Sequence, residues 1–199
     1  LERDLLALNI DALSHSGHLG PGARVPALAW IADFQHSRLP QNFSPQQRRS
    51  RDRHYAGLCR HAARIIVSSH NAREDLANFC PDAVPKIRVL QFVANVPDPA
   101  TLLPRDALER RYAFSGRYFF LPNQFWAHKN HRVVLDALSL LKRQGKALTV
   151  LASGKPADDR DPGHFSRLMQ FAEGLGVAGQ FRVLGLVPQG DLMALMWNS

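Results

Sequence analysis

The stretch FLPNQFWAHKNHRVVLDAL, residues 120–138, runs from an apolar segment through a polar turn into a helical pattern. RYFFLP, residues 117–122, is rich in aromatic residues and is typical of a strand, and KNHRVVLDALSLLKRQG, residues 129–145, has the apolar spacing of an amphipathic helix. A strand that leads through a short turn into a helix is the first half of a βαβ unit. The stretch therefore predicts an α/β fold with parallel strands.

The same alternation continues toward the end of the chain. ALTVLASG (147–154) and QFRVLGLV (180–187) are expected to be strands, with GHFSRLMQFAEGLG (163–176) as the helix between them. QGDLMALMWNS (189–199) begins a further helix, whose apolar side chains need a sheet beneath them. Together with residues 117–145, these segments predict one parallel sheet unit in the second half of the chain.

The first half of the chain shows the pattern too. Strands are expected over three apolar runs, residues 27–34, 64–69 and 86–92. Between the first two runs lies a helical segment, with Ser44 as its cap and Pro45 in its first turn. The helix after the second run is expected to start with a capping box of Asn71 and Glu74.

The segment VANVPDPATLLPR, residues 93–105, contains three prolines and no clear period, which indicates a connection between two lobes. We expect an acceptor-side lobe over 1–93, a linker over 94–116 and a second lobe over 117–199. The chain begins LERDLL without an initiator Met, and its last helix lacks a following strand. Both lobes are therefore expected to be incomplete, one at each end.

The composition is that of a globular protein with a basic surface. A net charge of +8 and a pI near 10.2 favour anionic partners such as nucleotides, phospholipid surfaces or nucleic acid. Cys59 and Cys80 have no metal-type spacing, and the histidine pairs lack accompanying acidic or Cys ligands, so neither a metal site nor a cofactor is expected. No apolar run reaches the length of a membrane span.

The turns after the strands are the places to search for a site, because ligands of parallel α/β sheets bind at the carboxyl ends of strands. Lys129 lies where the first helical turn exposes N–H groups and the positive end of its dipole. A basic residue there opposes the usual preference for acidic residues, and a bound phosphate or diphosphate would resolve the conflict. Alternatively, Lys129 is only solvated, and His128 and His131 cap or pack locally.

Two further turns follow strands of the second lobe. ASGKPADDRDP, residues 152–162, brings Gly154 and Lys155 to the same sheet edge, where glycine would permit a close approach of the backbone to a ligand. An ordinary turn is the alternative. In LGLVPQGDL, the backbone from Gly185 to Val187 could hydrogen-bond the edge of a nucleobase.

In the first lobe, Asp33 and His36 follow the strand of residues 27–34. A carboxylate and an imidazole three residues apart could orient or deprotonate an acceptor hydroxyl, which makes them the catalytic candidates. Alternatively, Asp33 caps the turn and His36 packs on Phe34 or Trp30. The basic run over residues 48–53 is expected to be a solvated helix face, although its arginines could bind acidic lipid head groups.

Four stretches, taken in order, resemble one known family: WIADFQHSRLPQNFS, IIVSSHNAREDL, FFLPNQFWAHKNH and FRVLGLVPQGDL. They look like the retaining, nucleotide-sugar-dependent glycosyltransferases of family 4 (group 1), which have the two-lobed GT-B fold. The resemblance extends from about Trp30 to Ser199. It implies two Rossmann-like lobes with parallel sheets, with the donor bound mainly by the second lobe and the acceptor mainly by the first.

The resemblance also implies roles for residues. It assigns the donor diphosphate to Lys129 and the nucleobase to the backbone of Gly185 to Val187. Asn123 and Gln124 in the same specific stretch, together with Gly154, complete the donor-binding candidates. Ala32 precedes Asp33 where many family members carry a histidine, so that His36 is the imidazole candidate.

The family's paired glutamates would lie beyond Ser199, so that this piece could be unable to catalyse alone. The expected partners are a nucleoside diphosphate sugar and a saccharide or lipid-linked acceptor, in the cytoplasm with peripheral contact at the inner face of the membrane. Nucleic acid is not expected, because no reading helix or aromatic RNA platform is visible. A basic nucleic-acid-binding module and a non-catalytic remnant of the fold are the alternatives.

Overall fold

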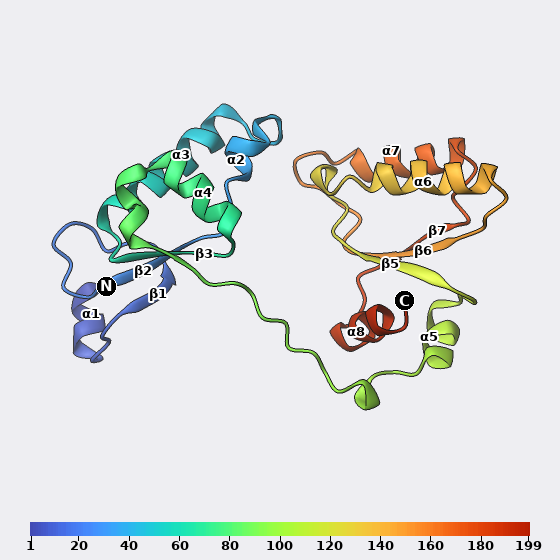
Figure 1. Cartoon of the computed structure of the whole chain (residues 1–199), viewed down its shortest axis with the longest axis horizontal. Coiled ribbons are helices and arrows are strands. Elements are labelled where there is room, and N and C mark those ends of the chain that lie inside the picture. The colour runs from blue at the N-terminus through green and yellow to red at the C-terminus, as the bar shows by residue number, and fades with distance from the viewer. The chain divides into compact units, whose positions relative to one another are not determined.

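The computed structural model describes all 199 residues and divides into two compact units, Leu1–Ala94 and Asn95–Ser199. Each unit is a parallel sheet with helices packed on it (Figure 1). None of the helices combines the length and apolar character that crossing a membrane requires.

The first unit contains a four-stranded parallel sheet in the order β1-β2-β3-β4. Its elements in chain order are α1 (Glu2–Ala7), β1 (Leu13–Ser16), β2 (Ala27–Ile31), α2 (Gln35–Arg38), α3 (Pro45–His61), β3 (Arg64–Val67), α4 (His70–Phe79) and β4 (Ile87–Val89), with short 3-10 turns at Pro40–Asn42 and Pro81–Lys86. The expected strands are present in shorter form. Strand β1 was not expected, because its sequence LSHS lacks the apolar pattern of the others.

Helices α3 and α4 lie over one face of this sheet (Figure 1). Alternate residues of β2 and β3 point into the core beneath them, where Ile31, Ile65 and Leu58 are fully buried. Helix α3 begins at the expected place: Ser44 accepts a hydrogen bond from the Gln47 N–H and its own N–H donates to the Gln47 side chain, which completes a capping box.

The start of α4 differs from the expectation. The cap is Ser69, whose hydroxyl accepts a hydrogen bond from the Ala72 N–H at 3.1 Å, and Asn71 already lies inside the helix. The predicted box of Asn71 and Glu74 is therefore wrong by two positions. Ser69 and Asn71 each offer a side-chain oxygen near the start of the helix, and only the backbone angles decide which of the two is the cap.

The second unit contains a three-stranded parallel sheet in the order β5-β6-β7. Its elements are α5 (Arg105–Tyr112), β5 (Tyr118–Pro122), α6 (His131–Arg143), β6 (Thr149–Ser153), α7 (His164–Gly174), β7 (Phe181–Gly185) and α8 (Gln189–Trp197), with 3-10 turns at Pro99–Thr101 and Ala127–Lys129. Helices α6 and α7 cover one face of the sheet, and α5 and α8 cover the other (Figure 1).

Helix α5 corrects the linker expected over 94–116. Its Leu108 is fully buried in a core shared with Tyr118 and Leu195. Its last turn is hydrogen-bonded to α8, since Arg111 and Tyr112 both donate to the buried carboxylate of Asp191 in that helix. Residues 105–112 are thus part of the second unit.

Candidate functional site

The three strands of the second unit end at one edge of the sheet, and a pocket lies there. Pro122 ends β5, Ser153 ends β6, and Leu186 follows β7 directly. The pocket has a volume of about 290 Å³, at the lower end of the sizes typical of small-molecule sites. Its lining residues are Pro122, Asn123, Gln124, Trp126, Lys129, Ser153, Gly154, Leu186, Val187 and Leu192.

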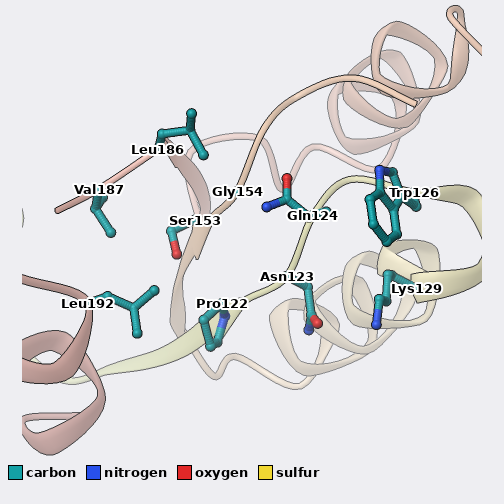
Figure 2. A pocket seen from close by; sticks show the side chains of 10 residues that line it. All are labelled: Pro122, Asn123, Gln124, Trp126, Lys129, Ser153, Gly154, Leu186, Val187 and Leu192. Atoms are coloured by element: carbon teal, nitrogen blue, oxygen red, sulfur yellow. The ribbon is translucent and has the colours of Figure 1, made fainter. Parts of the chain in front are cut away.

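The pocket has a polar end and an apolar end. Figure 2 shows Lys129, Asn123 and Trp126 on one side and Leu186 and Val187 on the other. The polar end belongs to the turn between β5 and α6, and the apolar end to the segment between β7 and α8. Such a pocket suits a ligand with an anionic group at one end and a flat, less polar group at the other.

Lys129 is the last residue of a short 3-10 turn, Ala127–Lys129, and it precedes α6. Asn130 caps α6 in the left-handed conformation, with φ 52° and ψ 47°, and its side chain makes no capping hydrogen bond. The Lys129 side chain is exposed and takes part in none of the ion pairs of the chain. Its positive charge at this edge of the sheet therefore has no protein anion beside it.

The electrostatics of this end favour an anion. The first turn of α6 contains no acidic residue, and no side chain caps its N–H groups. A helix N-terminus carries a partial positive charge, which the Lys129 ammonium increases. The combination of an uncapped helix start and an unpaired cation is the usual setting for a bound phosphate.

Neither histidine of the HKNH motif lines the pocket. His131 is only 1% exposed and stacks on Phe125, with ring centroids 4.6 Å apart and an angle of 17°. Neither of its ring nitrogens has a hydrogen-bond partner. Burial above all, then the neighbouring His164 and Lys129, lower the pKa of His131, against a smaller opposing effect of the Asn123 backbone. His131 is thus a neutral core residue beneath the turn.

Gly154 lines the pocket and also lies directly against the turn after β5. Its φ is 149°, and a Cβ added there would lie 2.2 Å from the Asn123 carbonyl oxygen. The next residue, Lys155, donates its N–H to the Gln124 side-chain oxygen at 2.7 Å, and its carbonyl accepts the N–H of Phe125. The turns after β5 and β6 are therefore in direct backbone contact. This contact holds Asn123 and Gln124 in place at the side of the pocket.

The turn after β7 contributes the apolar end. Val187 lines the pocket together with Leu186 and Leu192. Gly185 is not a lining residue, and its carbonyl accepts the Gly154 N–H at 2.9 Å. Of the six donor-binding candidates, the structure brings five to one pocket, namely Asn123, Gln124, Lys129, Gly154 and Val187.

The catalytic candidates of the first unit are engaged within their own turn. The Asp33 carboxylate accepts the Gln35 N–H at 3.0 Å at the start of α2. His36 is 2% exposed, stacks on Phe34 and pairs with Asp52 through Nε2 at 3.1 Å. The structure thus shows the alternative arrangement, in which Asp33 caps the turn and His36 packs into the core. A buried imidazole cannot reach an acceptor hydroxyl without a rearrangement, so we do not retain it as a catalytic group.

Sequence reasoning missed four lining residues, namely Pro122, Trp126, Ser153 and Leu192, whereas Leu186 lies within the predicted segment from Gly185 to Val187. Pro122 and Ser153 end predicted strands and Trp126 lies in the turn after β5, so their position supplies a signal that could have found them. Leu192 lies inside α8, where no such signal exists. No group of three or more His, Cys, Asp or Glu residues is arranged to hold a metal ion.

Neither a protein-family model nor a curated protein matches this sequence significantly. Solved structures do match. The chain is similar to a glycosyltransferase from Rickettsia africae, with a TM-score of 0.69 and 17% identity over 100% of this chain and 52% of that one.

Two other structures give the same result. HepE from Anabaena, solved in complex with UDP and glucose, matches with a TM-score of 0.67 and 18% identity over 87% of this chain and 44% of that one. Sucrose-phosphate synthase from Thermosynechococcus elongatus matches with a TM-score of 0.62 and 13% identity over 87% and 42%. This chain therefore spans about half the length of the proteins that it resembles.

These similarities confirm the expected fold. The chain has the GT-B architecture, with two Rossmann-like units built on parallel sheets. At identities below 20% they establish the fold alone, because one fold supports many functions.

Proposed function

We propose that the pocket of the second unit binds a nucleoside diphosphate sugar and that the protein transfers the sugar to an acceptor hydroxyl. The observation that carries this proposal is the unpaired Lys129 beside the uncapped start of α6, at the carboxyl edge of a parallel sheet. The solved complexes of HepE with UDP and with UDP-glucose support this choice of ligand class for the fold.

The two ends of the pocket suggest how the donor would lie. The diphosphate would face Lys129 and the first turn of α6, where the positive charge is greatest. The nucleobase would lie at the apolar end, against Leu186 and Val187. We propose that the backbone there hydrogen-bonds an edge of the base.

The same charges would serve the chemistry. When the bond between the sugar and the diphosphate breaks, negative charge grows on the leaving diphosphate, and fixed positive groups stabilise it most at that moment. The acceptor oxygen forms the new bond to the sugar carbon, and its proton leaves with the diphosphate. We propose attack from the face that the diphosphate vacates, which retains the configuration, as in the family 4 enzymes that the sequence resembles.

We also propose a class of acceptor and a cellular location. A saccharide or a lipid-linked acceptor fits the resemblance, with the protein in the cytoplasm and in peripheral contact with the membrane. His36 would not be the base, because it is buried beside Phe34. The acceptor's proton would instead pass to the departing diphosphate.

The decisive test compares two lysine variants of the 199-residue chain by calorimetry with UDP, GDP and UDP-glucose. Lys129→Ala removes the charge at the pocket, and Lys146→Ala removes an equal charge from the turn between α6 and β6, at the opposite end of the helix. Losing a hydrogen bond to a charged group costs about 1.5–3 kcal/mol, or roughly a 10- to 100-fold loss of affinity. We expect that loss for Lys129→Ala and almost none for Lys146→Ala. Equal affinities of the two variants would contradict the proposal.

A further inference from the structure

The loop between β6 and α7, residues 154–163, is tied to the turn that carries Lys129. Besides the Lys155 contacts, its Asp158 reaches across to the 3-10 turn. One carboxylate oxygen of Asp158 accepts the Ala127 N–H at 3.1 Å. A short helical turn has free N–H groups at its start, and Trp126, which precedes this one, offers no side-chain cap. Asp158 supplies that cap from a separate loop.

Asp158 also anchors Arg160. Its other oxygen accepts the backbone N–H of Arg160 at 3.1 Å and the side-chain Nε at 3.2 Å. Asp158 is only 4% exposed. Burial alone would raise its pKa, but the N–H groups of Ala127 and Arg160 and the Arg160 guanidinium outweigh that effect and lower the pKa. The carboxylate is therefore charged, with both of its oxygens in use.

Arg160 extends from this anchor over the turn. Its guanidinium carbon lies 5.7 Å from the centroid of the Trp126 ring, and its Nη2 donates to Nδ1 of His128 at 3.1 Å. His128 also lies beside Trp126, with ring centroids 5.5 Å apart. Arg160 thus contacts two of the three residues that precede Lys129, although it does not line the pocket itself.

Trp126 is the pocket residue on which these contacts act. It is 38% exposed and stands beside Lys129 at the polar end (Figure 2). A side chain with that exposure has room to change rotamer unless a neighbour restrains it. Arg160 is suited to this restraint, because its guanidinium lies over the Trp126 ring at a cation–π distance and donates a directed hydrogen bond to His128 at the same time.

We propose that Arg160, anchored by Asp158, is a positioning residue that holds Trp126 and the turn of Lys129 in place for the ligand of this pocket. The inference rests on the proposed function for the nature of the ligand, a nucleoside diphosphate. It extends that function to a residue outside the pocket. Small displacements of binding groups reduce affinity strongly, which is why such groups need supporting contacts.

The test uses the 199-residue chain with Trp30→Phe and Trp197→Phe, so that Trp126 is the single tryptophan. Two matched variants are made in this background. Arg160→Ala removes the restraint, and Arg167→Ala removes the same charge from a nearby arginine whose ion pair is with Asp161 and which does not contact the turn. Acrylamide quenching of Trp126 fluorescence reports the freedom of the ring, and titration with UDP reports affinity.

We expect Arg160→Ala to increase the quenching of Trp126 and to weaken UDP about fivefold, the equivalent of losing one contact of moderate strength. Arg167→Ala should leave both readouts within about twofold of the parent, because surface ion pairs contribute little. Arg160→Lys keeps the charge but lacks the planar fork, so it should behave like Arg160→Ala. Full restoration by Arg160→Lys would overturn the positioning role in favour of charge alone.

The quenching experiment separates this inference from the proposed function. If the parent binds no UDP, the proposed function fails, and the quenching of Trp126 in the free protein still decides whether Arg160 restrains the ring. If Arg160→Ala and Arg167→Ala give the same quenching, the inference is overturned whether or not UDP binds.

Discussion

The turn after β2 and the turn after β5 look alike in sequence but differ in the structure. Both follow a strand of a parallel sheet and both carry histidine and polar residues, in DFQH and in NQFWAHKNH. In the first, Asp33 caps α2 and His36 is buried against Phe34, so both are engaged within the unit. In the second, His131 is buried in a similar way, but Lys129 stays exposed beside a pocket.

This difference shows what distinguishes a candidate site from a well-packed turn. Polar residues at the end of a strand are common, and most of them satisfy the local backbone or pack in the core. A cation beside an uncapped helix start is different, because the fold supplies no anion to balance it.

The largest effect should follow from Gly154→Ala, which disrupts the wall of the second turn. The new Cβ would lie 2.2 Å from the Asn123 carbonyl oxygen, at a φ that side chains rarely adopt. Overpacking and backbone strain together should cost about 3 kcal/mol or more of unfolding free energy and remove UDP binding.

Gly174→Ala is the matched control for this substitution, because a Cβ at the end of α7 would meet no atom. Urea unfolding should show that variant at or slightly above the stability of the parent. Equal stabilities of the two glycine variants would show that the turns after β5 and β6 are not in contact as described.

A smaller effect on stability is expected from His36→Ala in the first turn. Removing a buried ring of this size leaves a cavity and an unpaired Asp52, at a cost of about 2–3 kcal/mol in urea unfolding. UDP affinity should not change, because His36 belongs to the first unit. His54→Ala, on the exposed side of α3, is the control and should stay within about 0.5 kcal/mol. A His36→Ala variant with unchanged stability would contradict the core role.

The smallest effect concerns pH and the histidine of the second turn. Because the pKa of His131 is lowered in the folded state, the unfolded chain binds the proton more readily. The stability that His131 contributes is therefore complete above its unfolded pKa, near 6.5, and is lost as the pH falls toward the folded pKa.

The His131→Phe variant tests this directly, since Phe can keep the stack on Phe125 and does not titrate. Unfolding free energy measured from pH 7.5 to 5 should fall less steeply for the variant, by at most about 1.4 kcal/mol per pH unit. Identical slopes for the variant and the parent would show that His131 is not buried as a neutral ring.

Much of the fold could be predicted from local patterns. The segments that became β2, β3 and β5 to β7 are rich in aliphatic and aromatic residues, and Ser44 before Pro45 marks the start of α3. Strand β1 could not be predicted, because LSHS is held by pairing with β2 and not by its own composition. Helix α5 was hidden by the prolines that precede it, and its position depends on the distant Asp191.

The candidate site was predictable only in part for the same reason. Lys129 could be singled out from the sequence alone, because its conflict with the helix dipole is a local feature. The cap that Asp158 provides to Ala127 joins residues that are 31 positions apart, and no local pattern indicates it. The burial of His36 likewise depends on Tyr55 and Phe43, which other segments bring to it.

The proposed binding of a diphosphate by Lys129 is tested most directly by a crystal structure of the chain with UDP. We expect a diphosphate oxygen about 2.7–2.9 Å from the Lys129 ammonium, in front of the first turn of α6, with the uracil toward Leu186 and Val187. A diphosphate bound elsewhere, with the Lys129 side chain paired to a protein carboxylate, would contradict it.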